Sequence, residues 1–415
     1  MRGTPAAAAA VPSAVTGALD PQTLARWRAE TPGCAARVHL NNAGASLMPT
    51  PVKDAITAHL GRESLEGGYE AADAAAESVN ATYHDLGRLV GAKPTEIAIL
   101  PSATHAFAQA LLAFDFAPGD AILTSSDDYI SNQLMYLSLR DRRGVRVVRA
   151  PDATEGGVDV EAFGALLRKE RPRLAALTWV PTNSGLVQPA AAIGRLCREA
   201  GVPYLLDACQ AVGQLPVDVE ALGCDYLSTT ARKFLRGPRG IGFLVVRERA
   251  LVRGDHPLLP DMRGARWTGD SAFTLVEDAR RFESWEFPYA LVLGLGAAVR
   301  YALEVGVEEA GERAAVLAAT VRARFAALRG VRSLDQGTTL CAIATFEVAG
   351  HQGRDLVLRL RAQGINTSAQ TRGDALLALT RQGADSLIRV SPHYYNTEQE
   401  IDVLAAALGR LIGAA

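Results

Sequence analysis

The feature that most constrains the fold of this chain is an alternation of short apolar runs with helical stretches between residues 93 and 246. The apolar runs have the length of buried strands, and they lie at 97–100, 121–124, 145–148, 174–179, 203–206, 226–228 and 242–246. Helical spacing lies between them, at 103–113, 131–142, 160–169 and 190–200. Strands that alternate with helices form a parallel or mixed sheet covered on both faces. We therefore predict an α/β fold with a mostly parallel sheet.

The remaining sequence predicts a second, smaller α+β unit. Two long helical stretches at 289–305 and 308–328 precede strand-like runs at 340–348, 364–368 and 387–391. With 415 residues, 48% of them hydrophobic, the chain is long enough for two or three domains. We predict a disordered Ala-rich tail at 1–19, an N-terminal segment at 20–44 that packs with the small domain, a large domain at 45–290 and a small domain at 291–415.

Composition excludes several classes of partner. The formal net charge is only -2, so no overall field would attract nucleic acid or an anionic membrane. The five cysteines are scattered without a C-x-x-C pair, which favours a reducing cytosol and gives no sign of a metal site. No run of about 20 apolar residues is long enough to cross a bilayer. We predict a cytoplasmic protein that acts on a small molecule.

Asp207 and Lys233 are the residues that point most clearly to chemistry. Asp207 ends the apolar run Leu205-Leu206, and Lys233 follows the next short strand, so both can reach the crevice at the carboxyl ends of the strands. A carboxylate that holds a pyridine nitrogen protonated and a lysine amine that forms a Schiff base are what pyridoxal 5'-phosphate (PLP) requires. Alone, Asp207 would be read as a helix N-cap and Lys233 as a surface cation. Together, with the Gly-Pro-Arg-Gly turn at 237–240, they predict a PLP site.

Three motifs resemble the class V aminotransferase family of fold-type I PLP enzymes. They are D-A-C-Q-A at 207–211, T-T-A-R-K-F-L-R-G-P-R-G-I-G-F-L at 229–244 and R-V-S-P-H-Y-Y-N-T-E-Q-E-I-D at 389–402. The resemblance runs from about Leu24 to Leu411, nearly the whole chain. It implies the fold-type I architecture, a large mixed-sheet domain and a small α+β domain with PLP between them.

Each role in cofactor binding is carried over from the resemblance at a matching position. Lys233 corresponds to the Schiff-base lysine and catalytic base, Asp207 to the partner of the pyridine nitrogen, and Gln210 to the residue that bonds the phenolic oxygen. The other positions implied are the phosphate-binding Ala103, Thr104, Thr230 and Arg232, the stacking Tyr129, and Thr182 beside the phenolic oxygen. Ser102 and Thr104 could instead only cap a helix, and Tyr129 could only cover the edge of the sheet.

The resemblance also implies substrate and subunit contacts. Arg389 corresponds to the arginine that binds the substrate α-carboxylate, although it could be a surface arginine, and Asn42 lies in a segment that lines the site in relatives. The stretch 282–285 corresponds to one that reaches the partner subunit, which predicts a homodimer with shared active sites.

The predicted reaction is β-elimination. Cysteine desulfurases need a nucleophilic cysteine on a loop before the C-terminal arginine motif. The corresponding stretch of this chain, 365–379, contains none. The stretches 25–28 and 66–72 resemble the carbon–sulfur lyase of ergothioneine biosynthesis. A cysteine S-conjugate or its sulfoxide would give an aminoacrylate that decays to pyruvate and ammonia. An aminotransferase, an isopenicillin N epimerase-like enzyme and a catalytically silent PLP-fold binding protein remain alternatives, whereas no G-x-G-x-x-G supports a nucleotide-binding protein.

Overall fold

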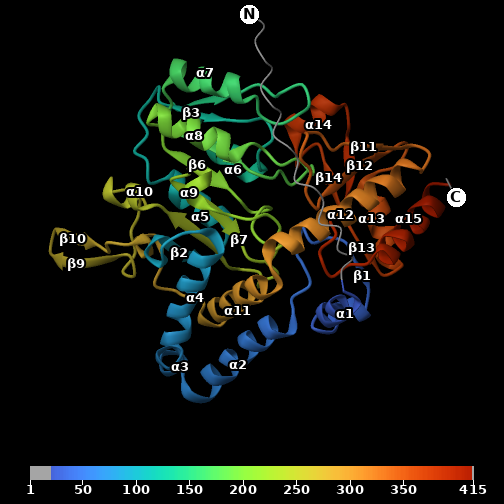
Figure 1. Ribbon diagram of the computed structural model, residues 1–415. Coiled ribbons are helices and arrows are strands. Elements are labelled where there is room, and N and C mark those ends of the chain that lie inside the picture. The colour runs from blue at the N-terminus through green and yellow to red at the C-terminus, as the bar shows by residue number, and fades with distance from the viewer. Residues whose placement is uncertain (1–19, 414–415) are drawn as a thin grey trace, which may run out of the picture.

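A seven-stranded sheet forms the centre of the computed structural model, which describes residues 20–413 (Figure 1). Its strands, in spatial order, are β2 (Ile97–Leu100), β8 (Gly242–Val246), β7 (Tyr226–Thr230), β6 (Tyr204–Asp207), β5 (Leu174–Thr178), β3 (Ala121–Thr124) and β4 (Arg146–Arg149). Neighbouring strands are parallel except at β8, which is antiparallel to both β2 and β7. The prediction of a mixed, mostly parallel sheet is confirmed.

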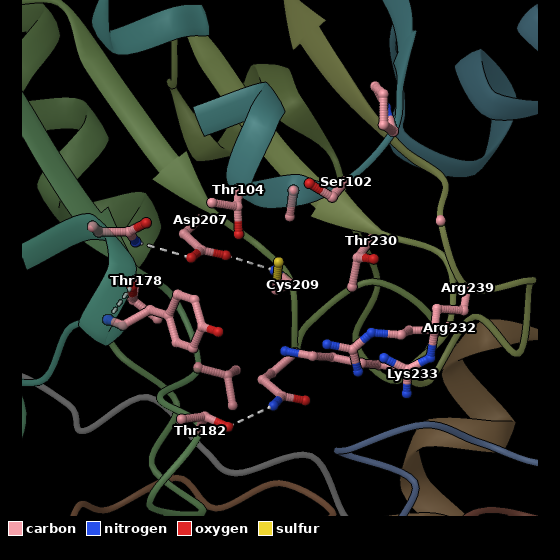
Figure 2. Close-up of a pocket in the computed structure, with 17 residues that line it drawn as sticks. Ser102, Thr104, Thr178, Thr182, Asp207, Cys209, Thr230, Arg232, Lys233 and Arg239 are labelled. Atoms are coloured by element: carbon pink, nitrogen blue, oxygen red, sulfur yellow. Dashed lines mark hydrogen bonds between the residues drawn. The ribbon is translucent and has the colours of Figure 1, made fainter. Parts of the chain in front are cut away.

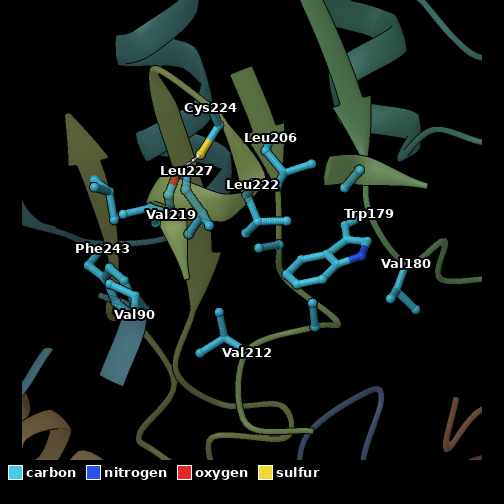
Figure 3. Close-up of a cluster of buried hydrophobic side chains, with 14 of the residues drawn as sticks. Val90, Trp179, Val180, Leu206, Val212, Val219, Leu222, Cys224, Leu227 and Phe243 are labelled. Carbon is cyan, nitrogen blue, oxygen red and sulfur yellow. Dashed lines mark hydrogen bonds between the residues drawn. The ribbon is translucent and has the colours of Figure 1, made fainter. Parts of the chain in front are cut away.

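Both faces of this sheet are buried, as its continuous apolar strands predict. Side chains alternate between faces along a strand, so Leu205 and Leu206 belong to different hydrophobic clusters. One cluster includes Phe107 of α5 (Ala103–Leu111) and Tyr136 of α6 (Ile130–Arg143). The other includes α7 (Val160–Glu170) and α8 (Ala190–Ala200), and Figure 3 shows part of it around Leu206. Full burial of one such leucine stabilises the fold by about 1.5–3 kcal/mol.

A separate four-stranded antiparallel sheet forms the smaller unit. Its strand order is β11 (Val331–Ser333), β12 (Ala344–Val348), β15 (Ser386–Val390) and β14 (Ser368–Thr371). Its core, which includes Phe325 and Phe346, is shared with the helices α12 (Val307–Ala326), α13 (Gly353–Ala362) and α15 (Glu398–Ile412). The large mixed sheet and this small unit together are the predicted fold-type I architecture.

The N-terminal segment pairs with the small unit. After α1 (Pro21–Ala29), strand β1 (Val38–His39) forms a parallel pair with β13 (Ile365–Asn366). Helix α11 (Tyr289–Val305), which precedes α12 in the chain, packs against α2 (Thr50–Glu66) and α4 (Ala76–Val90). The predicted tail at 1–19 lies outside the described residues, and the boundaries at 44/45 and 290/291 stay predictions.

Some elements differ from the sequence prediction. The run 340–348 gives a strand only from Ala344, because Leu340 forms an isolated bridge to Leu186 of the large unit. The run 364–368 is divided between β13 and β14, which belong to different sheets. The hairpin of β9 (Ala265–Gly269) and β10 (Ala272–Leu275) was missed because its aromatic side chains are exposed, without a buried strand's continuous apolar run.

No single helix among residues 20–413 is long and apolar enough to cross a membrane. The bent pair of α11 and α12 passes that test of length and composition only when the two are joined across a 79° break.

Candidate active site

A cavity of about 300 Å³ lies beyond the carboxyl ends of the parallel strands, where an open α/β sheet places its ligand (Figure 2). The ends of β5, β6 and β7 contribute Thr178, Asp207 and Thr230 to its wall. All of the predicted cofactor-binding residues line it, namely Ala103, Thr104, Tyr129, Thr182, Asp207, Gln210, Thr230, Arg232 and Lys233. The roles assigned to these residues stay predictions, but the structure brings them into one cavity.

Lys233 is distinguished from the other lysines by its burial. Its side chain lies in the cavity wall and the residue is 7% exposed, whereas the side chains of Lys53, Lys93 and Lys169 are at least 60% exposed and paired with acids. Burial lowers the pKa of the Lys233 amine, and the charge of Asp207 opposes that effect. A lower pKa increases the fraction of neutral amine, which is the form that acts as nucleophile and base. The surface-cation alternative for Lys233 is therefore wrong.

Asp207 is held in place by two hydrogen bonds. Its Oδ1 accepts from the backbone N–H of Cys209 at 2.9 Å, and its Oδ2 accepts from Nδ2 of Asn132 at 3.0 Å. The residues after Asp207 form turns rather than a helix, so it is not a helix N-cap. The carboxylate is buried at the cavity wall, where a charge needs a partner.

Asn132 and Thr178 were missed by the sequence analysis. Asn132 also donates to Oδ1 of Asp128 at 3.0 Å, and the Thr178 hydroxyl donates to the same oxygen at 2.6 Å. Burial raises the pKa of the Asp128 carboxyl, although these two hydrogen bonds oppose the shift. Two features of the sequence could have indicated these residues. Asn132 follows Tyr129 at helical spacing, and Thr178 lies at the end of a strand.

One end of the cavity is suited to an anion. Ser102 caps α5, because its Oγ accepts from the backbone N–H of His105 at 3.1 Å, and the next residues, Ala103 and Thr104, line the cavity. A helix N-terminus presents free N–H groups and a positive dipole end to a phosphate. A side chain on Gly242 would place its Cβ 3.2 Å from the backbone nitrogen of Ala103, so glycine lets β8 pass close beneath this turn.

Two arginines add positive charge at the same cavity. Arg232 and Arg239 both line it, and neither forms an ion pair with a carboxylate within residues 20–413. Burial and the neighbouring charge of Arg239 lower the pKa of Arg232. The guanidinium of Arg232 donates to the carbonyl of Gly44. Arg232 and Arg239 therefore suit a phosphate group, which accepts several charge-assisted hydrogen bonds.

Arg389 is a buried cation that contacts Thr182 in the cavity wall. It lies on β15 and donates to the carbonyl and the hydroxyl of Thr182 at 2.9 and 2.6 Å. Burial, reinforced by the charge of Arg232, lowers its pKa to about 10. Its Nε has no acceptor among the described residues. A buried cation that contacts only neutral groups favours an anionic ligand, so the surface-arginine alternative is wrong.

Asn42, which was predicted to bind substrate, is not among the residues that line the cavity. Its side chain is fully buried, donates to the carbonyl of Ser391 at 2.8 Å and accepts from the hydroxyl of Tyr395 at 2.5 Å. The adjacent Asn41 instead accepts from Arg389 at 3.4 Å. The role of Asn42 in substrate binding stays a prediction, and the geometry favours Asn41 for direct contact.

Gln210 has hydrogen-bonding capacity to spare. Its Nε2 donates to the carbonyl of Ala43 and the hydroxyl of Thr182, both at 3.1 Å, while its buried Oε1 has no partner among residues 20–413. Unpaired buried polar atoms are costly, so the unused capacity of Gln210 and Arg389 fits a polar ligand in this cavity. Together with the lysine, the carboxylate and the anion-binding end, these residues fit PLP.

The family model described as aminotransferase class V matches residues 38–404. The chain belongs to this family. It is a PLP-dependent enzyme, and the residues that would hold the cofactor are those of the cavity. Among the described residues, no cluster of histidine, cysteine or acidic side chains is arranged to hold a metal ion.

Curated relatives cover nearly the full chain. A probable cysteine desulfurase of Methanothermobacter thermautotrophicus is 26% identical over 91% of this chain and 95% of its own length. A probable cysteine desulfurase of Xylella fastidiosa is 30% identical over 80% of both chains. A probable hercynylcysteine sulfoxide lyase of Mycobacterium tuberculosis is 28% identical over 92% of both chains.

Solved structures have the same fold. The apo cysteine desulfurase of Thermococcus onnurineus NA1 superimposes with a TM-score of 0.86 at 22% identity, over 94% of this chain and 98% of the other. The Escherichia coli cysteine desulfurase CsdA gives 0.84 at 25% identity over 94% and 98%. A cystine C–S lyase solved with its reaction product cysteine persulfide gives 0.81 at 25% identity over 91% and 98%.

Proposed function

We propose that this protein is a PLP-dependent carbon–sulfur lyase that acts on a cysteine S-conjugate or its sulfoxide and releases pyruvate and ammonia. The observation that carries the proposal is Lys233, a buried lysine with a lowered pKa in a cavity that also contains Asp207 and lies beside Arg389. This combination provides a base, a carboxylate for the cofactor and a cation for the substrate within one site.

Arg389 and Lys233 would have separate roles in the reaction. Arg389 binds the α-carboxylate of the amino acid in a fork of hydrogen bonds, which orients the α-carbon. Bound PLP supplies the electron sink. The amine of Lys233 takes the α-proton, the bond between the β-carbon and sulfur breaks, and sulfur leaves with the electron pair. The released aminoacrylate then takes up water to give pyruvate and ammonia.

The state of the cysteines supports elimination rather than persulfide formation. The stretch 365–379, which forms β13, β14 and the start of α14 (Leu376–Gln382), contains no cysteine. Cys341 is buried in the core, and its burial raises the pKa of that thiol to about 12. Cys209 lines the cavity, but burial and the charge of Asp207 raise its pKa far above the ordinary range. A thiolate ready to accept sulfur is therefore missing from the site.

The relatives support a sulfur-containing substrate. Two kinds of activity are named among them, desulfuration of cysteine and cleavage of a carbon–sulfur bond in a sulfoxide or in cystine. The lack of a suitable cysteine in this chain favours the lyase over the desulfurase.

Product analysis with purified holoenzyme tests the proposal. S-substituted cysteines, their sulfoxides and free cysteine are incubated separately, and pyruvate, alanine and the sulfur product are quantified. We expect pyruvate with at least one conjugate or sulfoxide, and no alanine from cysteine. Alanine from cysteine would indicate a desulfurase. A keto acid formed from the substrate only when a second keto acid is present to accept the amino group would support an aminotransferase, and an inverted α-carbon would support an epimerase.

A further inference from the structure

A second cavity, of about 280 Å³, lies beside the first, between α6 of the large unit and α14 of the small unit. From α6 it is lined by Ile130, Leu134 and Leu137, whose spacing puts them on one helix face. From α14 it is lined by Leu376, Leu377 and Ala378. Leu134 and Leu376 are 59% and 61% exposed, which is unusual for two leucines that line the same cavity.

Two short segments of the chain contribute to both cavities. At the start of α6, Tyr129 lines the first cavity while its neighbour Ile130 lines the second. In the loop after β5, Thr182 lines the first and Asn183 the second. The first cavity is at the low end of the range of about 300–1,000 Å³ for small-molecule sites, so a group carried by the substrate beyond the reacting atoms needs additional space.

The charged groups that line the second cavity are two carboxylates, Asp128 and Asp374, and one guanidinium, Arg149. The guanidinium donates to the neutral Oε1 of Gln133 at 2.5 Å, and the carboxylate of Asp374 accepts from the backbone and side chain of Thr371 at 2.8 and 3.0 Å. Asp128 is hydrogen-bonded on both oxygens. Because the lining carries no excess of positive charge, it favours a neutral, largely apolar group over an anionic one.

Asn183 adds one polar contact to this lining. The residue is 4% exposed, and its Nδ2 has no hydrogen-bond partner among residues 20–413. A half-turn of the amide exchanges its nitrogen and oxygen, so the side chain can present either a donor or an acceptor to the cavity. A donor at this place suits an oxygen on or near the substrate sulfur.

We propose that the second cavity binds the substituent on the substrate sulfur, and that this substituent is an uncharged, apolar or aromatic group. The inference rests on the proposed lyase function and names its substrate class. The enzyme then prefers cysteine S-conjugates with a large apolar substituent over S-methyl compounds and over substituents that carry a carboxylate.

Equilibrium binding to the holoenzyme tests the inference without turnover. The probe is the analogue of S-benzylcysteine in which a methylene replaces the sulfur, and the reference is the corresponding analogue of S-methylcysteine. Neither compound has a sulfur leaving group. By calorimetry, we expect the benzyl analogue to bind about tenfold tighter or more, because its ring is removed from water.

Two variants test whether the second cavity supplies the preference for the benzyl analogue. Leu134→Glu on α6 and Leu376→Glu on α14 each place a carboxylate in the second cavity without disturbing the buried core. Each should remove most of the preference for the benzyl analogue, a loss of about tenfold, while the S-methyl analogue binds as before. The matched control is Leu358→Glu, a 51% exposed leucine on α13, which should leave both affinities unchanged.

Several outcomes would overturn the inference. Equal affinity for the two analogues would do so, as would an unchanged preference in both cavity variants. A change of oligomeric state in Leu134→Glu with the preference intact would identify the surface as a subunit contact instead. Failure of the lyase function is distinguishable, since it would abolish pyruvate formation from every conjugate while the difference in analogue binding remained.

Discussion

Arg389 is a buried cation with neutral contacts and a free Nε, and this arrangement leads to a direct prediction about the substrate. Arg389→Lys keeps the charge but removes the planar fork that binds a carboxylate bidentately. We expect KM for the amino-acid substrate to rise about tenfold or more, with a smaller change in kcat. Steady-state kinetics measures both, and Arg324→Lys, on an exposed ion pair, is the control. An unaltered KM would mean that the carboxylate binds elsewhere.

Individual site residues could be predicted where a local motif identifies them. Lys233, Asp207 and Gln210 lie in short segments whose residue types match the chemistry of PLP, and all three line the same cavity. Asn132 and Thr178 could not be found in this way, because their contacts join elements that are distant in sequence. Asparagine and threonine at such positions are common for local reasons alone, so only the folded geometry identifies them.

At the scale of elements, Arg381 connects α14 to the large unit. Its Nη2 lies 3.1 Å from both carboxylate oxygens of Asp127, and its Nη1 pairs with Asp152. Asp127 is buried two residues before Tyr129, so the contact joins the small unit to the loop that lines the cavity. Burial raises the pKa of Asp127, and the charge of Arg381 opposes that shift.

Arg381→Ala should therefore destabilise the protein in a pH-dependent way. Without Arg381 the pKa of Asp127 rises further, so the folded state binds more protons than the unfolded state and stability falls as pH rises. We expect a loss of about 2 kcal/mol at neutral pH, below the usual range for a buried pair because Arg381 is a third exposed, and a smaller loss near the ordinary aspartate pKa. Urea unfolding at both pH values measures the difference.

The control for that experiment is Arg324→Ala, which removes an exposed partner of Asp402. Its effect should be at most about 1 kcal/mol, because exposed ion pairs contribute little. An Arg381→Ala variant as stable as this control at neutral pH, or one whose deficit grows on acidification, would contradict the role assigned to the Asp127 contact.

For the whole molecule, the alternation of strands and helices was sufficient to predict the class of fold but not the spatial order of its strands. The insertion of the antiparallel β8 between β2 and β7 depends on the turn at 237–240, which follows the lysine. The exposed hairpin of β9 and β10 extends away from the sheet at the left of Figure 1, where no core pattern identifies it. The homodimer inferred from the stretch 282–285 stays a prediction.

The proposed chemistry depends on Lys233 holding PLP, and borohydride reduction of the holoenzyme tests this attachment most directly. Reduction fixes the cofactor covalently to its lysine, and peptide mass mapping then locates it among Lys53, Lys93, Lys169 and Lys233. We predict label on the Lys233 peptide alone, and none on any lysine in Lys233→Ala. Label on one of the exposed lysines, or no label after the protein has been saturated with PLP, would contradict the claim.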